Sequence, residues 1–370
     1  MPRLVALDLP VAQPLLDAIK QAWDDGDAVL PLDQRMLPAA RQRMASELGA
    51  HCITTNEGVL PLPGSEEVAP LADGDALVIA TSGSTGKPKG VVHTHRSLAA
   101  HAAMVGERLA LNHDHHWWLC LPAAHIGGFG VIARAWAHQA RITTAEHVDD
   151  RSITAALADG ATHTSVVPTM LKRFSFEQWQ RVLVGGARSD TVPSNAISTY
   201  GLTETGGGVV YDGRPLSDVK VRIRDGRIHL HAPSLARTYR HAPLALVDNW
   251  LDTGDIGELI DGQLRVDGRS DDVINSGGNK IWPQVVEQRL REHPLVADAV
   301  VRGIEDAEWG AIVCAWVQPV SPTQSPTLDA LRGHVKETLA AYCAPRKLIM
   351  VNHIPRNALG KIISADLPRP

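Results

Sequence analysis

Ten consecutive residues, 81–90, carry side chains suited to binding phosphate groups. They comprise three glycines, four Ser or Thr hydroxyls, two lysines and a proline. Gly83, Gly86 and Gly90 allow backbone angles that other residues avoid. The apolar run 75–80 precedes them and predicts a buried strand. A strand that leads into such a turn can direct backbone N–H groups at phosphate oxygens.

The spacing excludes the loop of the P-loop ATPases. That loop needs four residues between its first glycine and Gly-Lys-Ser/Thr. Here only two residues separate Gly83 from Gly86-Lys87, and Pro88 replaces the hydroxyl residue that binds the metal. A flexible surface loop is the remaining alternative, although low-complexity loops rarely keep this order of residues.

The composition is typical of a soluble protein, and the chain is long enough for two domains. The chain has 370 residues, of which 44% are apolar and 21% charged, and a net charge of −5, so we expect no nucleic-acid partner. No signal peptide or apolar stretch of membrane-spanning length occurs, so we expect a cytoplasmic protein without a membrane span. Cys120 and Cys314 lie in apolar runs and are predicted to be buried, reduced thiols.

The order of apolar patterns predicts an α/β fold followed by smaller units. Helical and strand-like segments alternate through the first two hundred residues, which favours a parallel sheet. From Val219 the apolar residues alternate, and Asp225-Gly226 and Asp261-Gly262 mark hairpin turns. The last hundred or so residues mix strands and helices, as in a small α+β domain.

Residues 81–90 resemble the phosphate-binding signature of the adenylate-forming enzymes. This superfamily comprises acyl-CoA synthetases, peptide-synthetase adenylation domains and luciferases. Four further segments resemble its motifs in the expected order: residues 198–204, 252–255, 268–283 and 355–361. The family fold is a large N-terminal α/β domain with an antiparallel hairpin subdomain and a small, mobile C-terminal α+β domain. The resemblance implies domains at 1–267 and 268–370 with a hinge near Asp271.

The resemblance also implies an ATP site and a Mg²⁺ ligand. It implies catalytic roles for Lys87, Thr203, Glu204 and Lys361. It also implies that Glu204 holds Mg²⁺, because a hard cation prefers a carboxylate oxygen. Asp255 accepts hydrogen bonds from the ribose hydroxyls. The residues implied to bind the nucleotide are Thr81, Ser82, Gly83, Ser84, Thr85, Gly86, Lys89, Gly185, Gly186, Ala187, Tyr200, Gly201, Asp255 and Arg269.

The implied reaction converts a carboxylic acid into a derivative that a thiol can attack. A carboxylate is a poor electrophile, because its leaving group would be oxide. Attack on the α-phosphate of ATP gives an acyl-adenylate, from which a thiol such as that of CoA displaces AMP. The phosphate loop, Lys361 and Mg²⁺ would stabilise the charge that moves onto pyrophosphate.

In detail the sequence looks most like the o-succinylbenzoate–CoA ligases. The resemblance rests on the short N-terminal region, residues 121–128 and residues 355–361. This acid carries a second carboxylate, which needs a cation or several donors. His125, Arg134 and Thr169 are the candidates. Arg134 could instead be a surface charge, and His125 a core histidine.

Several alternatives stay open. The acid could be aromatic or a fatty acid, the thiol could belong to a carrier protein, and the chain could be a nucleotide-binding regulator without activity. Glu204, Asp255 and Lys361 are all present, which argues against the regulator. The histidines of residues 112–116 are predicted to lie in a solvated loop, because no partners with metal-ligand spacing occur. The oligomeric state is open, with a homodimer among the alternatives.

Overall fold

The structure divides into two compact units. The computed structural model describes residues 1–63, 68–82, 88–186, 192–356, 362–363 and 366–370. The N-terminal unit comprises Met1–Val221 and Leu230–Leu251, and the C-terminal unit comprises Arg222–His229 and Asp252–Pro370.

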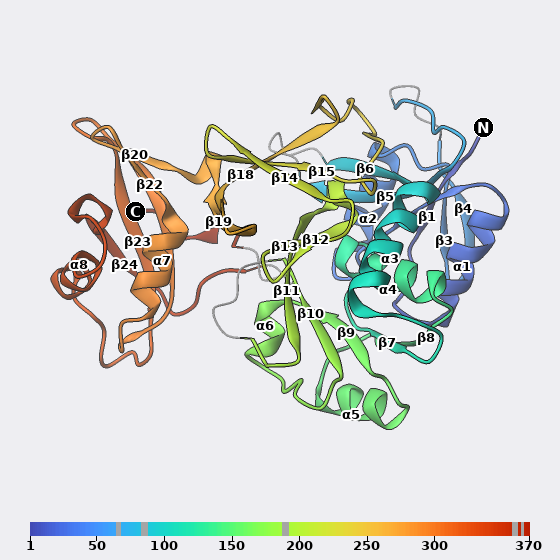
Figure 1. Cartoon of the computed structure of the whole chain (residues 1–370), viewed down its shortest axis with the longest axis horizontal. Helices are drawn as coiled ribbons and strands as arrows, with labels where there is room; N and C mark the ends of the chain where they lie inside the picture. Colours follow the sequence, from blue (N-terminus) through green and yellow to red (C-terminus); the bar gives the residue numbers. More distant parts are fainter. Residues whose placement is uncertain (64–67, 83–87, 187–191, 357–361, 364–365) are drawn as a thin grey trace. The chain divides into compact units, whose positions relative to one another are not determined.

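The first sheet of the N-terminal unit has parallel strands at its centre and antiparallel strands toward its edges (Figure 1). β1 pairs in parallel with β2 and β3, and β2 with β5. β4, β6 and β16 pair antiparallel with their neighbours. In spatial order the strands are β16 (Thr238–Tyr239), β6 (Pro88–Thr94), β5 (Asp75–Ser82), β2 (Ala28–Pro31), β1 (Leu4–Leu7), β3 (Cys52–Thr55) and β4 (Gly58–Pro61).

The second sheet of this unit is antiparallel at one edge only. Its strands β8, β7, β9, β10 and β11 are parallel, and β12 and β13 continue antiparallel. Val182, Leu183 and Val184 are buried, as expected of a parallel strand covered on both faces. In spatial order the strands are β13 (Arg214–Pro215), β12 (Gly207–Tyr211), β11 (Ala196–Leu202), β10 (Arg181–Val184), β9 (His163–Val166), β7 (His116–Leu119) and β8 (Arg141–Thr144).

Two helices connect the sheets of the N-terminal unit. α3 (His95–Leu109) contacts β5 and β6 of the first sheet and β12 of the second, and α4 (Ile126–Ala137) packs along α3 and contacts β7 and β9. α3 begins at Thr94, whose hydroxyl accepts a hydrogen bond from Ser97 N, as a capping box requires. The other helices are α1 (Gln13–Asp24), α2 (Pro38–Glu47), α5 (Asp150–Ala158) and α6 (Pro168–Leu171).

The predicted hairpins are confirmed. Asp225 and Gly226 have φ of 52° and 76°, and Asp261 and Gly262 have φ of 50° and 75°, values that favour a two-residue turn between twisted strands. Both hairpins belong to one sheet, and the boundary between the two units runs through this sheet. Its strands are β14 (Lys220–Arg224), β15 (Arg227–His231), β18 (Trp250–Ile260) and β17 (Leu246–Val247), with β19 (Gln263–Arg269) paired to β18.

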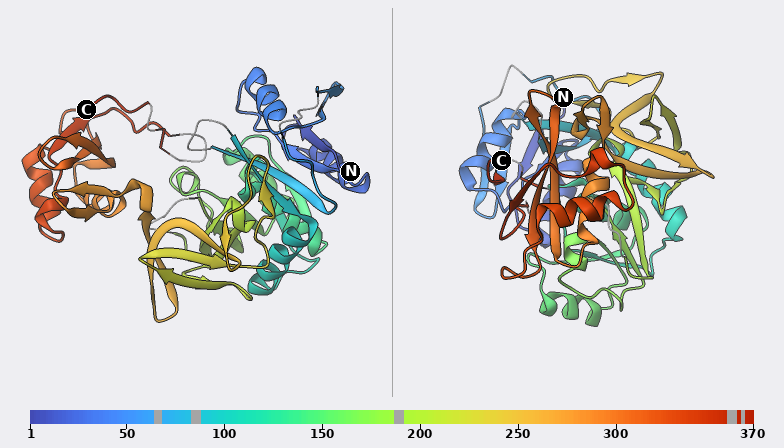
Figure 2. Two further views of the ribbon diagram at one scale, coloured as in Figure 1. Left: turned by 90° about the horizontal axis from the view of Figure 1, so that it is seen from above. Right: turned by 90° about the vertical axis from the view of Figure 1, so that its left-hand side faces the viewer.

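The rest of the C-terminal unit is an α+β structure (Figure 2). Alternate residues of its long strands face two apolar clusters: Val301 packs with Leu290 and Leu331 of two helices, whereas Val300 packs with Trp316 on the other face. The elements are β20 (Ile274–Ser276), β21 (Asn279–Ile281), α7 (Pro283–Arg291), β22 (Val296–Asp306), β23 (Gly310–Pro319), α8 (Leu328–Lys336) and β24 (Lys347–Met350). None of the helices built from described residues has the length and apolar character needed to cross a bilayer.

Adjacent glycines at the start of α4 have different surroundings. A Cβ added at Gly128 would overlap the backbone carbonyl oxygens of Leu121 and Pro122, which cannot move without shifting the chain. A Cβ at Gly127 would lie 3.5 Å from Leu121 Cδ1, an ordinary contact. The close turn from β7 into α4 therefore depends on Gly128 and not on Gly127.

We expect Gly128→Ala to lower the free energy of unfolding by about 1–3 kcal/mol through overpacking. Gly127→Ala, the matched control, should leave it unchanged or raise it by up to about 1 kcal/mol, because alanine is the better helix former. Urea unfolding followed by the fluorescence of the nine tryptophans measures both. Equal midpoints for the two variants would contradict the assigned crowding.

Candidate active site

The candidate residues of the N-terminal unit follow the carboxyl ends of its parallel strands. Thr81 is the last residue but one of β5, His125 follows β7, Thr169 follows β9, and Gly185 follows β10. In open α/β sheets, ligands bind beyond this edge. The strand topology therefore brings these segments to the same side of each sheet.

The phosphate loop joins two paired strands. β5 and β6 run antiparallel, with Thr81 opposite Lys89 and Ser82 opposite Pro88 at their open end. Predicted nucleotide ligands between these strands, namely Gly83, Ser84, Thr85, Gly86 and Lys87, lie outside the described residues. Thr81 is half-buried and Lys89 is exposed.

Position 90 requires glycine because a larger side chain would not fit there. The prediction that the backbone angles of Gly90 require glycine is wrong. It lies inside β6 and is not among the glycines with positive φ. A Cβ there would lie 2.5 Å from Cγ of Arg240 and 2.9 Å from Cδ2 of Leu48. Arg240 is buried at this point, where its Nε donates to Leu48 O at 2.9 Å and its Nη1 to Ala69 O at 2.7 Å.

The backbone of Thr203 and Glu204 is held from two sides. These residues form the 3₁₀ turn Thr203–Thr205 after β11. Thr203 O accepts from His93 Nε2 at 2.7 Å, and Glu204 O accepts from Ala236 N at 2.8 Å. Burial lowers the pKa of His93 to about 4, so the ring is neutral at pH 7 and donates through Nε2. The turn is thus fixed against β6 without an added charge.

The carboxylate of Glu204 meets a residue that the motifs do not indicate. Tyr239 Oη donates to Glu204 Oε1 at 2.9 Å, and Lys89 Nζ lies 5.6 Å from the centroid of the Tyr239 ring. Burial, followed by the charge of Glu204 and this hydrogen bond, raises the pKa of Tyr239, so the phenol remains a donor. Tyr239 therefore connects a predicted metal ligand with a predicted phosphate ligand.

Glu204 suits a metal that is shared with a nucleotide. No group of three or more His, Cys, Asp or Glu side chains able to hold a metal exists among the described residues. Mg²⁺ in nucleotide enzymes is commonly held by one or two carboxylates together with phosphate oxygens. A single half-buried carboxylate beside the phosphate loop fits that pattern.

One predicted adenine segment follows β10, and the other lies in the neighbouring strand β11. A Cβ at Gly185 would be 2.8 Å from Thr199 Oγ1 of β11, and Gly186 has a φ of 88°. Ala187 lies outside the described residues. Tyr200 and Gly201 are at a bulge in the pairing of β11 with β12, and a Cβ at Gly201 would overlap Gly207 O. Gly201 is therefore required by the close approach of these two strands.

His125 is not a core histidine. Its side chain is 27% exposed, and its Nε2 lies 3.0 Å from Asp33 Oδ2 and 2.9 Å from Arg35 Nη2. Burial disfavours the charged carboxyl of Asp33, but hydrogen bonds from His125 and Arg35 outweigh it and lower the pKa of Asp33. Asp33 and Arg35 follow β2, so this contact joins the carboxyl edges of the two sheets.

Arg134 is not a surface charge. It is 4% exposed, and its guanidinium lies 4.8 Å from the ring centroid of Trp117. Its Nη2 donates to Ser165 Oγ at 3.0 Å, and its Nε has no hydrogen-bond partner among the described residues. No carboxylate within the described parts of the chain forms an ion pair with it. Thr169, in the first turn of α6, is half-buried.

The C-terminal unit contains Asp255, Arg269 and Asp271. Asp255 is buried, and its Oδ1 accepts from Arg269 Nη1 at 3.2 Å, while the same nitrogen donates to Thr253 O at 2.9 Å. Asp271 is exposed in the 3₁₀ turn Ser270–Asp272. Lys361 lies outside the described residues.

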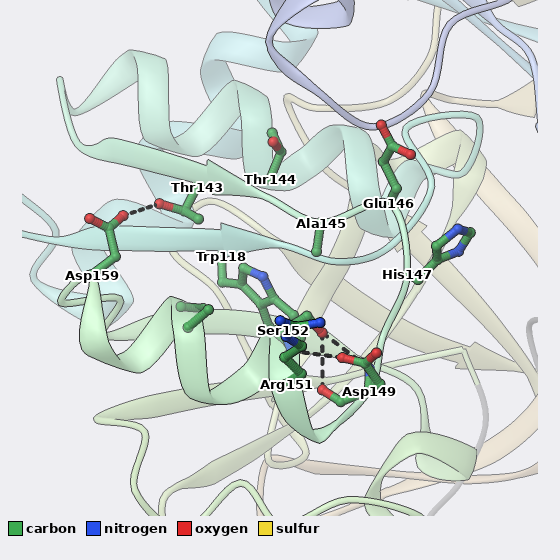
Figure 3. A pocket seen from close by; sticks show the side chains of 12 residues that line it. Trp118, Thr143, Thr144, Ala145, Glu146, His147, Asp149, Arg151, Ser152 and Asp159 are labelled. Atoms are coloured by element: carbon green, nitrogen blue, oxygen red, sulfur yellow. Dashed lines mark hydrogen bonds between the residues drawn. The ribbon is translucent and has the colours of Figure 1, made fainter.

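A cavity of about 570 Å³ between β8 and α5 is lined by none of the candidate residues (Figure 3). Its polar groups bond one another. Asp149 accepts from Ser152 N at 2.7 Å, and Thr143 Oγ1 donates to Asp159 at 2.6 Å. We assign it no role in the reaction.

Sequence motifs miss several described residues that contact the candidates, and four of them bear on the argument. These are Asp33, Arg35, His93 and Tyr239. His93 is separated from the phosphate loop by only a few residues of β6, so its position could have suggested a role. Asp33, Arg35 and Tyr239 reach their partners through pairings between distant segments, and no local pattern marks them.

Comparison with protein families identifies both parts of the chain. Residues 13–260 match the family model described as AMP-binding enzyme, and residues 285–361 match the AMP-binding enzyme C-terminal domain. The expected superfamily and fold class are thereby confirmed.

Curated relatives and solved structures agree with this assignment. A Mycobacterium tuberculosis protein named "Probable 2-succinylbenzoate--CoA ligase" is 35% identical over 346 residues, which cover 85% of this chain and 89% of the relative. A 2-succinylbenzoate–CoA ligase of Listeria monocytogenes is 32% identical over 321 residues, 78% of this chain and 68% of the relative.

Among solved structures, o-succinylbenzoate coenzyme A synthetase (MenE) from Bacillus subtilis in complex with AMP has a TM-score of 0.84 at 23% identity, covering 100% of this chain and 88% of the other. An Escherichia coli MenE variant with bound OSB-AMS has a TM-score of 0.76 at 25% identity, covering 95% and 84%. The chain therefore belongs to the AMP-binding enzymes, the adenylate-forming family that its motifs predict.

Proposed function

We propose that the protein converts a carboxylic acid, ATP and CoA into an acyl-CoA thioester, AMP and pyrophosphate, and that the acid is o-succinylbenzoate. The relatives named 2-succinylbenzoate–CoA ligases support this assignment. The reaction class is supported by the contact of Tyr239 with both Glu204 and Lys89. The observation on which the choice of acid rests is the buried charge of Arg134, which forms no ion pair with any residue that the structure describes.

In the first step an oxygen of the acid's carboxylate attacks the α-phosphorus of ATP. The bond from this phosphorus to the bridging oxygen breaks, and pyrophosphate leaves with the electron pair. Lys87, Lys89 and Lys361 would stabilise the charge that develops on the departing group. Glu204 would hold Mg²⁺, which neutralises phosphate charge when bound. Asp255, with Arg269 beside it, would accept hydrogen bonds from the ribose hydroxyls.

In the second step the sulfur of CoA attacks the acyl carbon. The bond to the phosphate oxygen breaks, AMP leaves with the electron pair, and the thiol proton passes to solvent. Lys361 serves only the first step, so the small domain must reorient between the two. We propose Asp271 as the hinge, at the junction of domains 1–267 and 268–370, because it is exposed in a short turn. A cytoplasmic location and a homodimer remain predictions of the sequence.

Arg134 supports a substrate with a second negative charge. Burying a cation without a partner carboxylate is costly, because water no longer solvates it. Two described groups near Arg134 supply no compensating charge: burial raises the pKa of Tyr211 to about 12, and burial first, then Arg134 itself, lower the pKa of His101 to about 3. Both are neutral at pH 7. The free carboxylate of o-succinylbenzoate would supply the missing charge, with His125 and Thr169 as further ligands.

The assignment is tested directly by AMP formation. We expect AMP release that requires both CoA and o-succinylbenzoate, with a larger kcat/KM for this acid than for benzoate or a fatty acid. The measurement is a coupled assay across an acid panel at saturating Mg²⁺ and ATP. Faster turnover of a monocarboxylic acid would contradict the assigned substrate. AMP formation that does not depend on CoA would contradict the assigned acceptor.

Arg134→Met should lower activity with a dicarboxylic acid more than activity with a monocarboxylic acid. Methionine can occupy the space over Trp117 but cannot pair with a carboxylate. We expect kcat/KM for o-succinylbenzoate to fall by roughly 10–100-fold, the scale of a hydrogen bond to a charged group. Activity with benzoate should change little, and the unfolding midpoint should stay or rise because a buried unpaired charge is gone. Equal losses on both acids would show that Arg134 does not bind the second carboxylate.

Lys361→Ala should separate the two half-reactions. Adenylation, measured in single turnover from acid and ATP, should slow by roughly 10²–10³-fold, because one charge-stabilising donor is lost. Thioester formation from supplied acyl-adenylate and CoA should stay near the normal rate. Lys336→Ala, an exposed lysine on α8 of the same domain, is the control and should affect neither step. Slowing of both steps alike would mean that Lys361 is structural.

A further inference from the structure

Tyr239 lies on a short strand that is firmly attached to the phosphate hairpin. β16 pairs with β6, with Tyr239 opposite Val91, and the next residue, Arg240, donates from its backbone N to Gly90 O at 2.8 Å. The Tyr239 ring packs in an apolar cluster with Val91, Ala236, Leu244 and Leu251. The ring therefore has little freedom to move relative to the end of the phosphate loop.

The hydroxyl of this ring takes up one oxygen of Glu204. A carboxylate has two oxygens that accept hydrogen bonds, and Tyr239 Oη occupies Oε1 at 2.9 Å. The backbone around Glu204 is fixed as well, because Thr203 O, Glu204 O and Thr205 O accept from His93 Nε2, Ala236 N and Ser234 Oγ. With main chain and one oxygen fixed, the carboxylate has one orientation. Because no residue in the described ranges bonds to Oε2, this oxygen is available to a cation.

The same ring keeps two opposite charges apart. Lys89 Nζ lies 5.6 Å from the ring centroid, a cation–π distance, while Glu204 binds the hydroxyl. In the parts of the chain that the structure describes, no ion pair joins Lys89 to Glu204. A direct pair would neutralise both groups before the nucleotide arrived. The ring allows Lys89 to serve a phosphate and Glu204 to serve a metal.

We propose that Tyr239 is a positioning residue for adenylation, which orients the metal-binding carboxylate of Glu204 and holds Lys89 beside the phosphate loop. This inference rests on the proposed function, since it concerns the site for ATP and Mg²⁺. Tyr239 touches neither substrate in this role. It acts through Glu204 and Lys89.

The test is metal binding by Tyr239→Phe, which keeps the ring and removes the hydroxyl. Mn²⁺ binding to the protein with β,γ-methylene-ATP is followed by the electron paramagnetic resonance signal of free Mn²⁺. We expect the dissociation constant of Mn²⁺ to rise about tenfold, the scale of one hydrogen bond to a charged group. Thioester formation from supplied acyl-adenylate should be unchanged, because that step no longer needs the metal at Glu204.

Two further variants distinguish positioning from damage to the fold. Thr238→Val changes the neighbouring residue of β16 and should leave Mn²⁺ affinity at the wild-type value. In a Glu204→Gln background, Tyr239→Phe should cause no further loss, because a residue that acts through Glu204 has no independent effect. Additive losses would overturn the inference, and so would unchanged Mn²⁺ affinity in Tyr239→Phe.

The outcomes for this inference and for the proposed function differ. If the wild-type protein binds Mn²⁺ with the nucleotide analogue and Tyr239→Phe binds both equally well, only the positioning role is wrong. If the wild-type protein fails to bind the analogue and releases no AMP with any acid, the proposed function itself is wrong.

Discussion

The direction of the parallel strands is the constraint on which the site depends. In each sheet of the N-terminal unit the parallel strands end at one common edge, so the residues that follow them are neighbours whatever their separation in sequence. Asp33 after β2 and His125 after β7 are ninety-two residues apart, and their side chains meet at 3.0 Å. Short turns at this edge can then hold polar groups in place without long loops.

Some of the buried side chains that form hydrogen bonds in this unit are uncharged. The buried histidines His93 and His101 donate to backbone carbonyls in their neutral form, because burial lowers the pKa of each well below 6.5. They provide hydrogen bonds without repelling a cation. Arg134 is the contrasting case, a full charge buried against an aromatic ring. The unit thus uses neutral donors for structure and keeps a charge where an anion can compensate it.

Local patterns in the sequence predicted elements and motifs well. Alternating residues and the Asp-Gly pairs indicated the two hairpins. These signals are local, since the geometry of a hairpin turn involves only a few adjacent residues. The adenylate-forming family was predicted on the same basis, from short motifs in a fixed order, and the matched family models confirm it.

Long-range packing could not be predicted in the same way. The residues around Arg134 are apolar, and an arginine among them is by default expected at the surface. Its burial depends on Trp117 of β7 and Ser165 of β9, two strands that lie outside its own helix. Gly90 looked like a flexible turn residue, but its requirement is set by Arg240, which lies one hundred and fifty residues later. Tyr239 belongs to a two-residue strand that has no recognisable pattern of its own.

Arg240 also has a consequence for the order of assembly during synthesis. Its side chain reaches Leu48 and Ala69, and its backbone completes the pairing beside β6. A ribosome makes roughly 5–20 residues each second. The edge of β6 therefore lacks its partner strand for several seconds, while more than a hundred further residues emerge. Nascent chains must keep this edge from pairing with other chains for that time. The carboxylate of Glu204, the predicted metal ligand, gains its fixed orientation only when Tyr239 of the late segment docks.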